Sequence, residues 1–483
     1  MAINAAMQWW IRTGGSNNNG AGYDSTVASA GTNYADQDTA QLALTDIVAN
    51  GTTTLTSVTG GFTTAMIGNV IKLRSFSSGG ATGYRVITAR TDTNTITVDA
   101  TVTTGTGGSG NVGGASATLL NFTNGGTAGT PAVTSPLAAG HTLNLQGAGT
   151  DDPSSADYTN TGYMQFASGS SGSGIIRLIG YNGRPYISAN GLTIYNVTAW
   201  KIQNVKFKIT GTSSGSADLG ILNGSTPLDL DNVYVDMNGQ DIAGLKGAGH
   251  VVNSKFINSG STTAGTYAAI LPGQWGARIY GCTIDKWRGY GIEFDSVMQS
   301  AQFCTITNCK KTGVGAINVS ASTFDYRSAI INCTIDGNAA DGIKFSNIGL
   351  ADCLIRNNII TTNGGYGINC STGTTAFNDR AFTITPDYNN FGTGATANTS
   401  GARNALSAGT HDLALDPQFT NAAAGDYSVG TNMKAAASPG VFPGGLSTGY
   451  LDIGAVQRQE PAASSGGVTV PTAVFGSSMM VGA

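Results

Sequence analysis

The tetrapeptide NCTI, residues 332–335, is one of seven related phrases that recur between residues 204 and 360. The others are NVKF at 204–207, NVYV at 232–235, NSKF at 253–256, GCTI at 281–284, FCTI at 303–306 and NNII at 357–360. Between the second positions of successive phrases the steps are 28, 21, 28, 22, 29 and 25 residues. A constant phrase with spacers of variable length is typical of stacked coils that carry loop insertions.

The length of the step indicates what one coil contains. A strand rises about 3.3 Å per residue, so three short strands with three turns use about 20–30 residues. The chain then returns above its starting point and pairs with the coil below at a spacing of about 4.8 Å. The phrases therefore predict a parallel β-solenoid.

Within each phrase the second and fourth positions point to the same side, because side chains alternate along a strand. These positions are small or apolar in nearly every copy, so we expect them to face the interior. Cys282, Cys304 and Cys333 occupy the second position of three successive phrases. No two Cys have C-x-x-C spacing and none lies near a His, so interior packing is favoured over a disulfide or a zinc site.

The first position of the phrase is Asn in five of the seven copies. Asn accepts left-handed backbone angles more readily than most residues, and it can hydrogen-bond to its counterpart on the next coil. We therefore expect a ladder of Asn side chains at one turn of the solenoid. Its members are Asn204, Asn232, Asn253, Asn332 and Asn357.

The composition favours β structure and excludes several classes of protein. Gly accounts for 70 of 483 residues, charged residues account for 11%, and only Glu293 and Glu460 are glutamates. A chain with 40% apolar residues and a net charge of −4 is not of the disordered type. The absence of a Lys/Arg block argues against nucleic-acid binding, and there is no apolar run of 18 residues to span a membrane. The first ten residues lack the regions of a secretory signal, so we expect the chain to fold in a cytoplasm.

The chain divides into four expected parts. They are a lead-in and capping segment (1–50), a small inserted β module (51–115), the solenoid (116–460) and a C-terminal docking tail (461–483). In the first part, a helix is expected from Asp36 to Val48, where it would cover the open end of the solenoid. In the uncharged tail, we expect Phe475, Met479 and Met480 to contact a partner subunit.

Residues 120–460 resemble the right-handed parallel β-helix proteins of the pectate-lyase-like superfamily. The resemblance rests on the Asn-x-x-Ile phrases and on a Gly-apolar pair nine residues after the second position of four of them. Residues 8–45 and the β module after them are similar to the N-terminal part of β-helix proteins of tailed bacteriophages. Members of the superfamily are polysaccharide lyases and hydrolases, phage tailspikes, or non-catalytic virion and surface proteins. Fold alone does not choose among them.

Three carboxylates recur at one position of the repeat. Asp236, Asp285 and Asp336 each lie three residues after the second position of a phrase, on alternate coils, so they should line one outer face about 10 Å apart. Glycosidases use two carboxylates at about 5–10 Å, so this row is a candidate acid/base site, with ordinary outward polar residues as the competing interpretation. Asp229 and Asp231 near Asp236 match no calcium loop, and neither a metal site nor a cofactor is predicted.

Four aromatic residues gather over one coil, namely Trp275, Tyr280, Trp287 and Tyr290. Exposed aromatic rings beside Asn and Asp bind sugars by stacking and hydrogen bonding, so they are candidate glycan contacts. The competing interpretation is a loop that packs on the wall of the solenoid.

The sequence thus predicts an all-β protein, a right-handed parallel β-helix with a small β module near its N-terminus. The predicted function is that of a bacteriophage virion structural protein, assembled in the host cytoplasm and displayed on head or tail as decoration, fibre or spike. As partners we expect two further copies in a homotrimer, other virion proteins, and a host surface glycan or receptor. The alternative is a polysaccharide-degrading enzyme of this fold, such as a depolymerase tailspike, and the sequence leaves catalysis open. A bacterial surface adhesin would need an export signal, which is not expected here.

Overall fold

The protein is described by a computed structural model. The described residues are 7–23, 32–119, 136–150, 156–160, 174–189, 194–209, 222–260, 263–273, 275–296, 298–313, 315–320, 326–346, 351–369, 384–393, 399–400, 409–438 and 452–457. Within them the structure is all β, apart from the short 3-10 helices η2 (Thr64–Met66) and η5 (Ala422–Ala424). None of their helices has the length and apolarity needed to cross a membrane.

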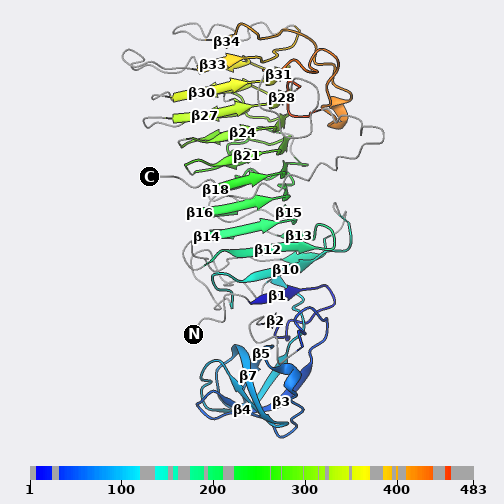
Figure 1. Ribbon diagram of the computed structural model, residues 1–483, viewed down its shortest axis with the longest axis vertical. Helices are drawn as coiled ribbons and strands as arrows, with labels where there is room; N and C mark the ends of the chain where they lie inside the picture. Colours follow the sequence, from blue (N-terminus) through cyan, green and yellow to red (C-terminus); the bar gives the residue numbers. More distant parts are fainter. Residues whose placement is uncertain are drawn as a thin grey trace, which may run out of the picture.

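A long solenoid of parallel strands stands on a small N-terminal module (Figure 1). The solenoid has three faces, called A, B and C. Face A contains β1 (Gln8–Ile11), β10 (Thr142–Gln146), β12 (Ile176–Tyr181), β14 (Ile194–Gln203), β16 (Leu222–Asp231), β18 (Leu245–Val252), β21 (Arg278–Tyr280), β24 (Ser300–Gln302), β27 (Tyr326–Ile331), β30 (Ala351–Arg356) and β33 (Ile384–Asp387).

Face B contains β20 (Ile270–Leu271), β23 (Ile292–Phe294), β26 (Ile317–Val319), β29 (Ile343–Phe345), β32 (Ile368–Asn369) and β34 (Thr399–Ser400). Face C contains β11 (Tyr158–Asn160), β13 (Tyr186–Ala189), β15 (Lys206–Ile209), β17 (Tyr234–Asp236), β19 (Lys255–Ile257), β22 (Thr283–Asp285), β25 (Thr305–Thr307), β28 (Thr334–Asp336) and β31 (Ile359–Thr361). Strand β18 pairs with β20 at its start and with β21 at its end, so faces A and B diverge from this long strand.

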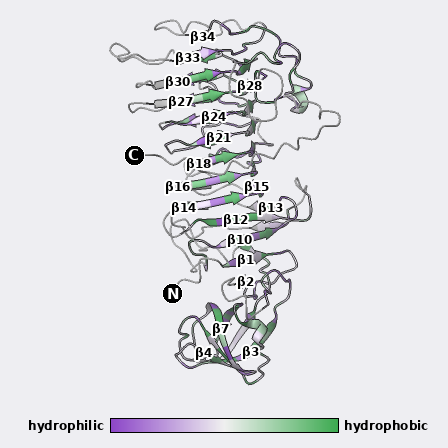
Figure 2. Ribbon diagram, viewed as in Figure 1, coloured by the Kyte–Doolittle hydropathy of each residue, from purple (hydrophilic) through white to green (hydrophobic). Residues whose placement is uncertain are grey.

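Each repeated phrase turns the chain from face A into face C. The first position lies at the corner with a left-handed backbone, at φ 56° for Asn204 and 53° for Phe303. The second and fourth positions are buried in all seven copies, as the alternation of side chains requires. The fourth positions are in register from Phe207 to Ile360, and they form one column of the core. Figure 2 shows hydrophobic and hydrophilic residues mixed along the strands of the solenoid, as expected where only every second side chain faces the core.

The N-terminal module is an antiparallel barrel. Its strands are β3 (Leu42–Ala49), β4 (Thr54–Thr56), β5 (Val70–Ser75), β6 (Ser78–Gly79), β7 (Gly83–Asp92), β8 (Thr95–Val98) and β9 (Gly105–Val112). Pairing runs β3–β4–β8–β7–β5–β9 and returns to β3, so six strands close the barrel and β6 adds to β9 at its margin. The helix expected from Asp36 to Val48 is wrong, because residues 42–49 form β3.

The barrel closes one end of the solenoid core. Val70 and Val86 of the barrel belong to the same buried cluster as Trp9 of β1, and the Tyr84 ring meets the Trp9 ring edge-on at 5.4 Å. Gly22 in β2 (Gly22–Tyr23) lies in this junction, where a Cβ atom would come within 2.7 Å of Val70 Cγ2. A barrel therefore covers the end that the sequence assigned to a helix.

The C-terminal segment packs against the outward side of face C at the last coils. Residues 409–438 and 452–457 pack beside the last coils, where Val429, Met433 and Ile453 form a small core with Ile359 of β31. The Gly454 N–H donates to the Asn357 carbonyl at 2.8 Å. The tail residues Phe475, Met479 and Met480 lie outside the described residues.

Candidate functional site

The three row carboxylates end successive alternate strands of face C. Asp236 closes β17, Asp285 closes β22 and Asp336 closes β28. The register places Ile257 between the first two and Thr307 between the last two. Two coil steps separate neighbouring carboxylates, which is about 10 Å.

The Asp236 carboxylate is fully used in hydrogen bonds within the fold. Its side chain is buried and accepts from the Asn238 N–H at 2.9 Å and from the Ser259 N–H at 3.1 Å. The Ser259 hydroxyl donates to both carboxylate oxygens, at 3.0 and 2.7 Å, and Lys208 Nζ lies 3.9 Å away. A buried carboxylate with this many donors stabilises the turn that holds it.

Asp285 is partly exposed. It accepts from Thr307 Oγ1 at 3.0 Å and from Asn308 Nδ2 at 2.8 Å, both on the next coil. Lys286 Nζ lies 3.9 Å from its second oxygen, and both side chains are partly exposed. At this exposure the ion pair contributes little, so the two hydrogen bonds are its main structural contribution.

The C-terminal segment covers Asp336. Thr362 Oγ1 and the Tyr427 hydroxyl both donate to its carboxylate. Burial raises the pKa of Asp336 above the ordinary value of a carboxyl group. Burial, and then the charge of Asp336, raises the pKa of Tyr427 to about 12. Tyr427 of the C-terminal segment thus interacts with this carboxylate.

This arrangement limits what the row can do chemically. A general acid beside a base at about 10 Å corresponds to the upper end of the spacing in inverting glycosidases. However, a catalytic carboxylate must reach a substrate proton, and here neighbouring coils supply the donors to all three groups. The geometry therefore fits links between coils better than catalysis.

The four aromatic candidates do not form one surface. Trp275 is 78% exposed, whereas Trp287 is 1% exposed and donates its Nε1–H to the Tyr267 carbonyl at 2.9 Å. The Tyr290 hydroxyl donates to Glu293, and Tyr280 packs on Phe303 with ring centroids 5.2 Å apart. Trp287 as a glycan contact is therefore wrong, because its ring lies in the core.

The Cys and Asn columns hold backbone positions. Cys282, Cys304 and Cys333 are buried free thiols whose Sγ atoms lie 3.3–3.5 Å from carbonyl oxygens. Burial raises the pKa of the Cys282 and Cys333 thiols, which makes them poor nucleophiles. The five Asn have left-handed φ, and Asn232 Nδ2 donates to Asn204 Oδ1 at 3.0 Å.

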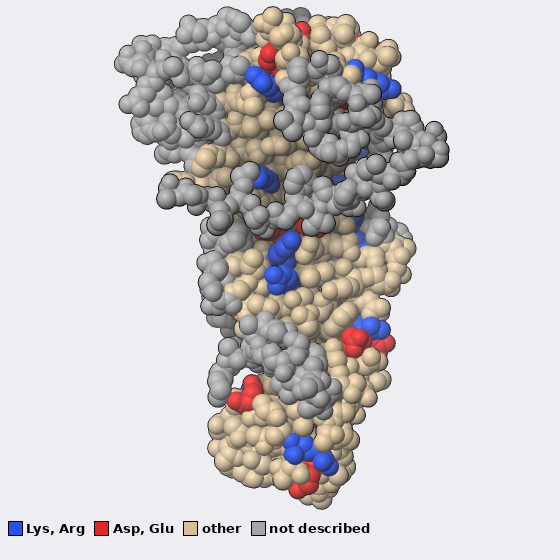
Figure 3. Space-filling view, in the orientation of Figure 1, with Lys and Arg blue, Asp and Glu red and all other residues tan. Residues whose placement is uncertain are grey.

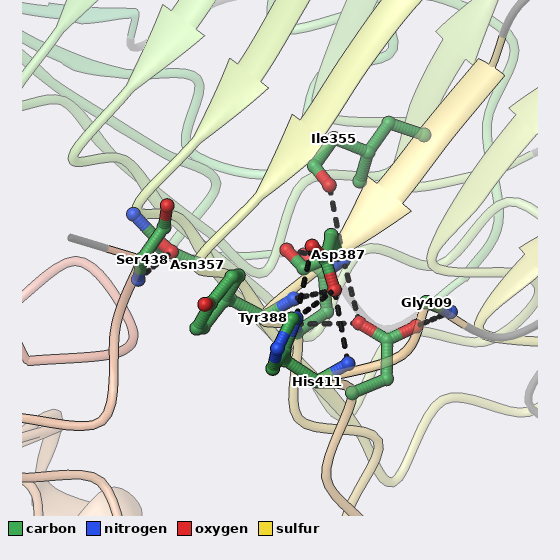
Figure 4. A network of polar contacts seen from close by, with 9 residues as sticks. Ile355, Asn357, Asp387, Tyr388, Gly409, His411 and Ser438 are labelled. Atoms are coloured by element: carbon green, nitrogen blue, oxygen red, sulfur yellow. Dashed lines mark hydrogen bonds and ion pairs between the residues drawn. The ribbon is translucent and has the colours of Figure 1, made fainter. Parts of the chain in front are cut away.

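A polar network lies at the last coil, at residues that were not among the candidates from the sequence. Asp387 accepts from the His411 N–H at 3.0 Å and from His411 Nδ1 at 3.2 Å, while the His411 ring stacks on Tyr388 at 4.3 Å (Figure 4). Burial opposes ionisation of Asp387, but the hydrogen bonds from His411 and Tyr388 lower its pKa. The 24-residue separation of Asp387 and His411, one coil length, was the available signal. The network joins the last coil to the C-terminal segment.

The residues that the structure describes show no evident metal site. The described residues contain no group of three His, Cys, Asp or Glu side chains that could hold an ion. Of the other histidines, His141 is buried, and its Nδ1 accepts from Trp9 Nε1 at 3.1 Å.

Comparison with known proteins agrees with this architecture. The family described as "Right handed beta helix region" matches residues 241–409. The fold is a right-handed parallel β-helix. This confirms the predicted fold class. The crystal structure of pectate lyase Pel9A is similar over 70% of this β-helix chain and 95% of its own, with 15% identity and a TM-score of 0.41. No curated protein sequence matches the chain.

Proposed function

We propose that this β-helix is a non-catalytic structural scaffold. The observation that carries the proposal is the use of the candidate carboxylates: Asp236, Asp285 and Asp336 each accept hydrogen bonds from the following coil or from the C-terminal segment. A row built in this way joins coils to one another. It does not present a free acid and base to a substrate.

The interior supports the same proposal. Asn358 is buried, accepts from the Cys333 N–H at 2.8 Å and donates to Asn389 Oδ1 at 2.9 Å. Asn389 in turn donates to Asp412 of the C-terminal segment at 3.2 Å. Buried polar groups that are satisfied across coils fix the register of the stack. A stack of coils with a fixed register is suited to a structural role.

The proposal extends to a setting and an assembly. We place the chain in a bacteriophage virion, on head or tail, as a homotrimeric decoration, fibre or spike protein. The support is the similarity of residues 8–45 and the inserted β module to phage β-helix proteins. Light scattering coupled to size exclusion tests the trimer, since a monomeric mass would contradict it. Detection of the chain in purified particles by mass spectrometry tests the virion location.

An assay on polysaccharides tests the scaffold proposal directly. The purified chain is incubated with a panel of acidic and neutral glycans, and new reducing ends and unsaturated uronates are measured. We expect neither product. Release that disappears in Asp285→Asn while the fold is retained would contradict the proposal.

One observation favours the alternative, a polysaccharide-degrading enzyme. Asp336 has a raised pKa and lies about 10 Å from Asp285, which resembles an acid paired with a base. If this pair is catalytic, Asp336→Asn and Asp285→Asn each abolish glycan cleavage, and Asp236→Asn, outside the pair, leaves it intact. The scaffold proposal expects the largest loss of stability from Asp236→Asn, because Asp236 is the most buried of the three.

A further inference from the structure

Two cations lie next to each other on the outer side of one barrel strand. Lys72 and Arg74 alternate in β5 with Ile71 and Leu73, which are buried in the core of the barrel. The two basic residues therefore project to the same outer side, about 7 Å apart along the strand. Lys and Arg number only 24 in 483 residues, and Figure 3 shows how few charged side chains one face of the molecule carries. Like charges this close repel each other, so the pair is unfavourable unless a negative charge lies near it.

The strands around the pair supply no acid. Tyr84 of β7 and Asn111 of β9 flank Lys72 in register. Neither β5 nor β9 contains Asp or Glu, and the acidic residue of β7, Asp92, lies eight residues from Tyr84, about 26 Å along the strand. The neighbouring loop of residues 13–20 is also uncharged. Among the described residues, neither cation forms an ion pair.

Neutral contacts hold both side chains in place and leave them able to donate further hydrogen bonds. Lys72 Nζ donates to the Asn17 carbonyl at 2.6 Å and lies 5.1 Å from the centre of the Tyr84 ring. Arg74 Nη2 donates to Asn111 Oδ1 at 3.1 Å. The Arg74 Nε–H is buried and has no hydrogen-bond partner within the part of the chain that the structure describes. An ammonium has three N–H donors and a guanidinium five, so each cation can serve another acceptor.

The pKa of Lys72 reflects the same imbalance of charge. Burial, and then the charge of Arg74, lowers the pKa of Lys72 to about 8. A lysine that is hard to ionise and a buried donor without an acceptor both cost free energy, and an anion between the two side chains would reduce both costs.

We propose that Lys72 and Arg74 form a binding site for a small divalent oxyanion, such as sulfate or phosphate. The guanidinium donates its Nε–H and a terminal N–H to two oxygens of the anion, and the ammonium donates to a third. Both side chains are partly exposed, so the anion can enter from solvent. The loop of residues 13–20 reaches the site through the Asn17 carbonyl and the Asn19 side chain. A bound anion therefore fastens this loop to the barrel.

Calorimetry with sodium sulfate at neutral pH tests the site, with the ionic strength held constant by chloride. The site lies on the barrel, so the result does not depend on whether the solenoid is a scaffold or an enzyme. We expect one sulfate to bind per chain. An absence of binding beyond that of chloride would overturn the proposal.

Variants locate the site. Lys72→Gln and Arg74→Gln are each expected to weaken sulfate binding about tenfold. The matched control is Arg90→Gln, which removes one charge from the same barrel six residues beyond Tyr84, about 20 Å along β7, and should bind like the parent chain. Equal losses in all three variants would overturn the proposal, because binding would then follow net charge. Each variant is first checked for an unchanged circular dichroism spectrum.

The pH dependence of binding identifies Lys72. The titratable groups that face it are Arg74 and Tyr84, because β9 and residues 13–20 offer none. Burial raises the pKa of Tyr84, so that group stays neutral. The affinity for sulfate should therefore fall as the pH rises through about 8, where Lys72 loses its proton. Lys72→Arg keeps the charge and should bind without this fall, so a parallel fall in the variant would overturn the assignment.

Hydrogen exchange tests the effect on the loop. Saturating sulfate should slow exchange of the amides of residues 16–20 in the parent chain. Arg74→Gln shares any general effect of sulfate on stability, and it should show no such slowing. Equal exchange in the two proteins would overturn the proposed role of the anion in holding the loop.

Discussion

Replacement of Asn358 by Val tests whether the interior amides hold the coils together. Val205 and Val233 occupy the same position of the phrase in earlier coils, so the wall accepts the shape of Val. The change removes the acceptor of the buried Cys333 N–H and the donor to the Ile330 carbonyl, bonds of 2.8 and 2.9 Å. Each orphaned buried group costs about 2 kcal/mol, so we expect a loss of about 4 kcal/mol.

The measurement is urea unfolding followed by near-ultraviolet circular dichroism, with Asn332→Gly as the matched control. Asn332 also has a buried amide, but its Oδ1 has no hydrogen-bond partner, and its φ of 54° suits Gly. The control should lose less than about 1 kcal/mol. If the Asn358→Val variant is as stable as this control, the amide column does not stabilise the stack and the reasoning is refuted.

Three further changes test other parts of the molecule. Hydrogen bonds from Ser57 and from the neighbouring backbone lower the pKa of Asp46 to about 2. The stability that this carboxylate contributes is present above the pKa of the unfolded carboxyl group and is lost as the pH falls through about 2. Thermal melts should therefore show that Asp46→Asn destabilises the barrel at neutral pH and makes no difference near pH 2. Gly342→Ala would place a Cβ atom 2.4 Å from Ile360 Cγ2, so urea unfolding should show a loss of about 1–3 kcal/mol. Tyr84→Ala should loosen the barrel from the first coil, and faster proteolysis at the junction checks this, with unchanged cleavage as the contrary result.

The repeat could be predicted because one strong constraint acts on each coil. The corner needs a left-handed residue and the next positions need small or apolar ones, so the phrase carries its own geometry in Asn332, Cys333 and Ile335. The same register predicted the row of carboxylates formed by Asp236, Asp285 and Asp336. It could not predict their hydrogen-bond donors, because these donors come from residues on other coils.

The helix expected over residues 36–48 failed for a local reason. Leu44 and Ile47 are both buried in β3 although they are three residues apart, because the register with β9 shifts between them. Such a bulge imitates the spacing of a helical face. The prediction that Trp287 contacts a glycan was wrong for a different reason. Trp287 lies five residues after Cys282, and the buried Cys309 lies five residues after Cys304. This shared offset was the signal in the sequence that Trp287 is buried.

The barrel interrupts the first coil without disturbing it. The chain leaves the solenoid after β1 and returns from the barrel at Ser116, which pairs with Ile11 of β1. The Ser116 N–H donates to the Trp10 carbonyl at 2.9 Å, so the two ends of the inserted segment lie side by side. A module inserted in this way can be replaced by another module through recombination while the solenoid stays intact. The exchange has one condition, because Trp9 depends on cover from the barrel. Any module that replaces the barrel must supply apolar side chains that cover Trp9. The sequence of the module is therefore constrained where it contacts the first coil and is free to vary elsewhere.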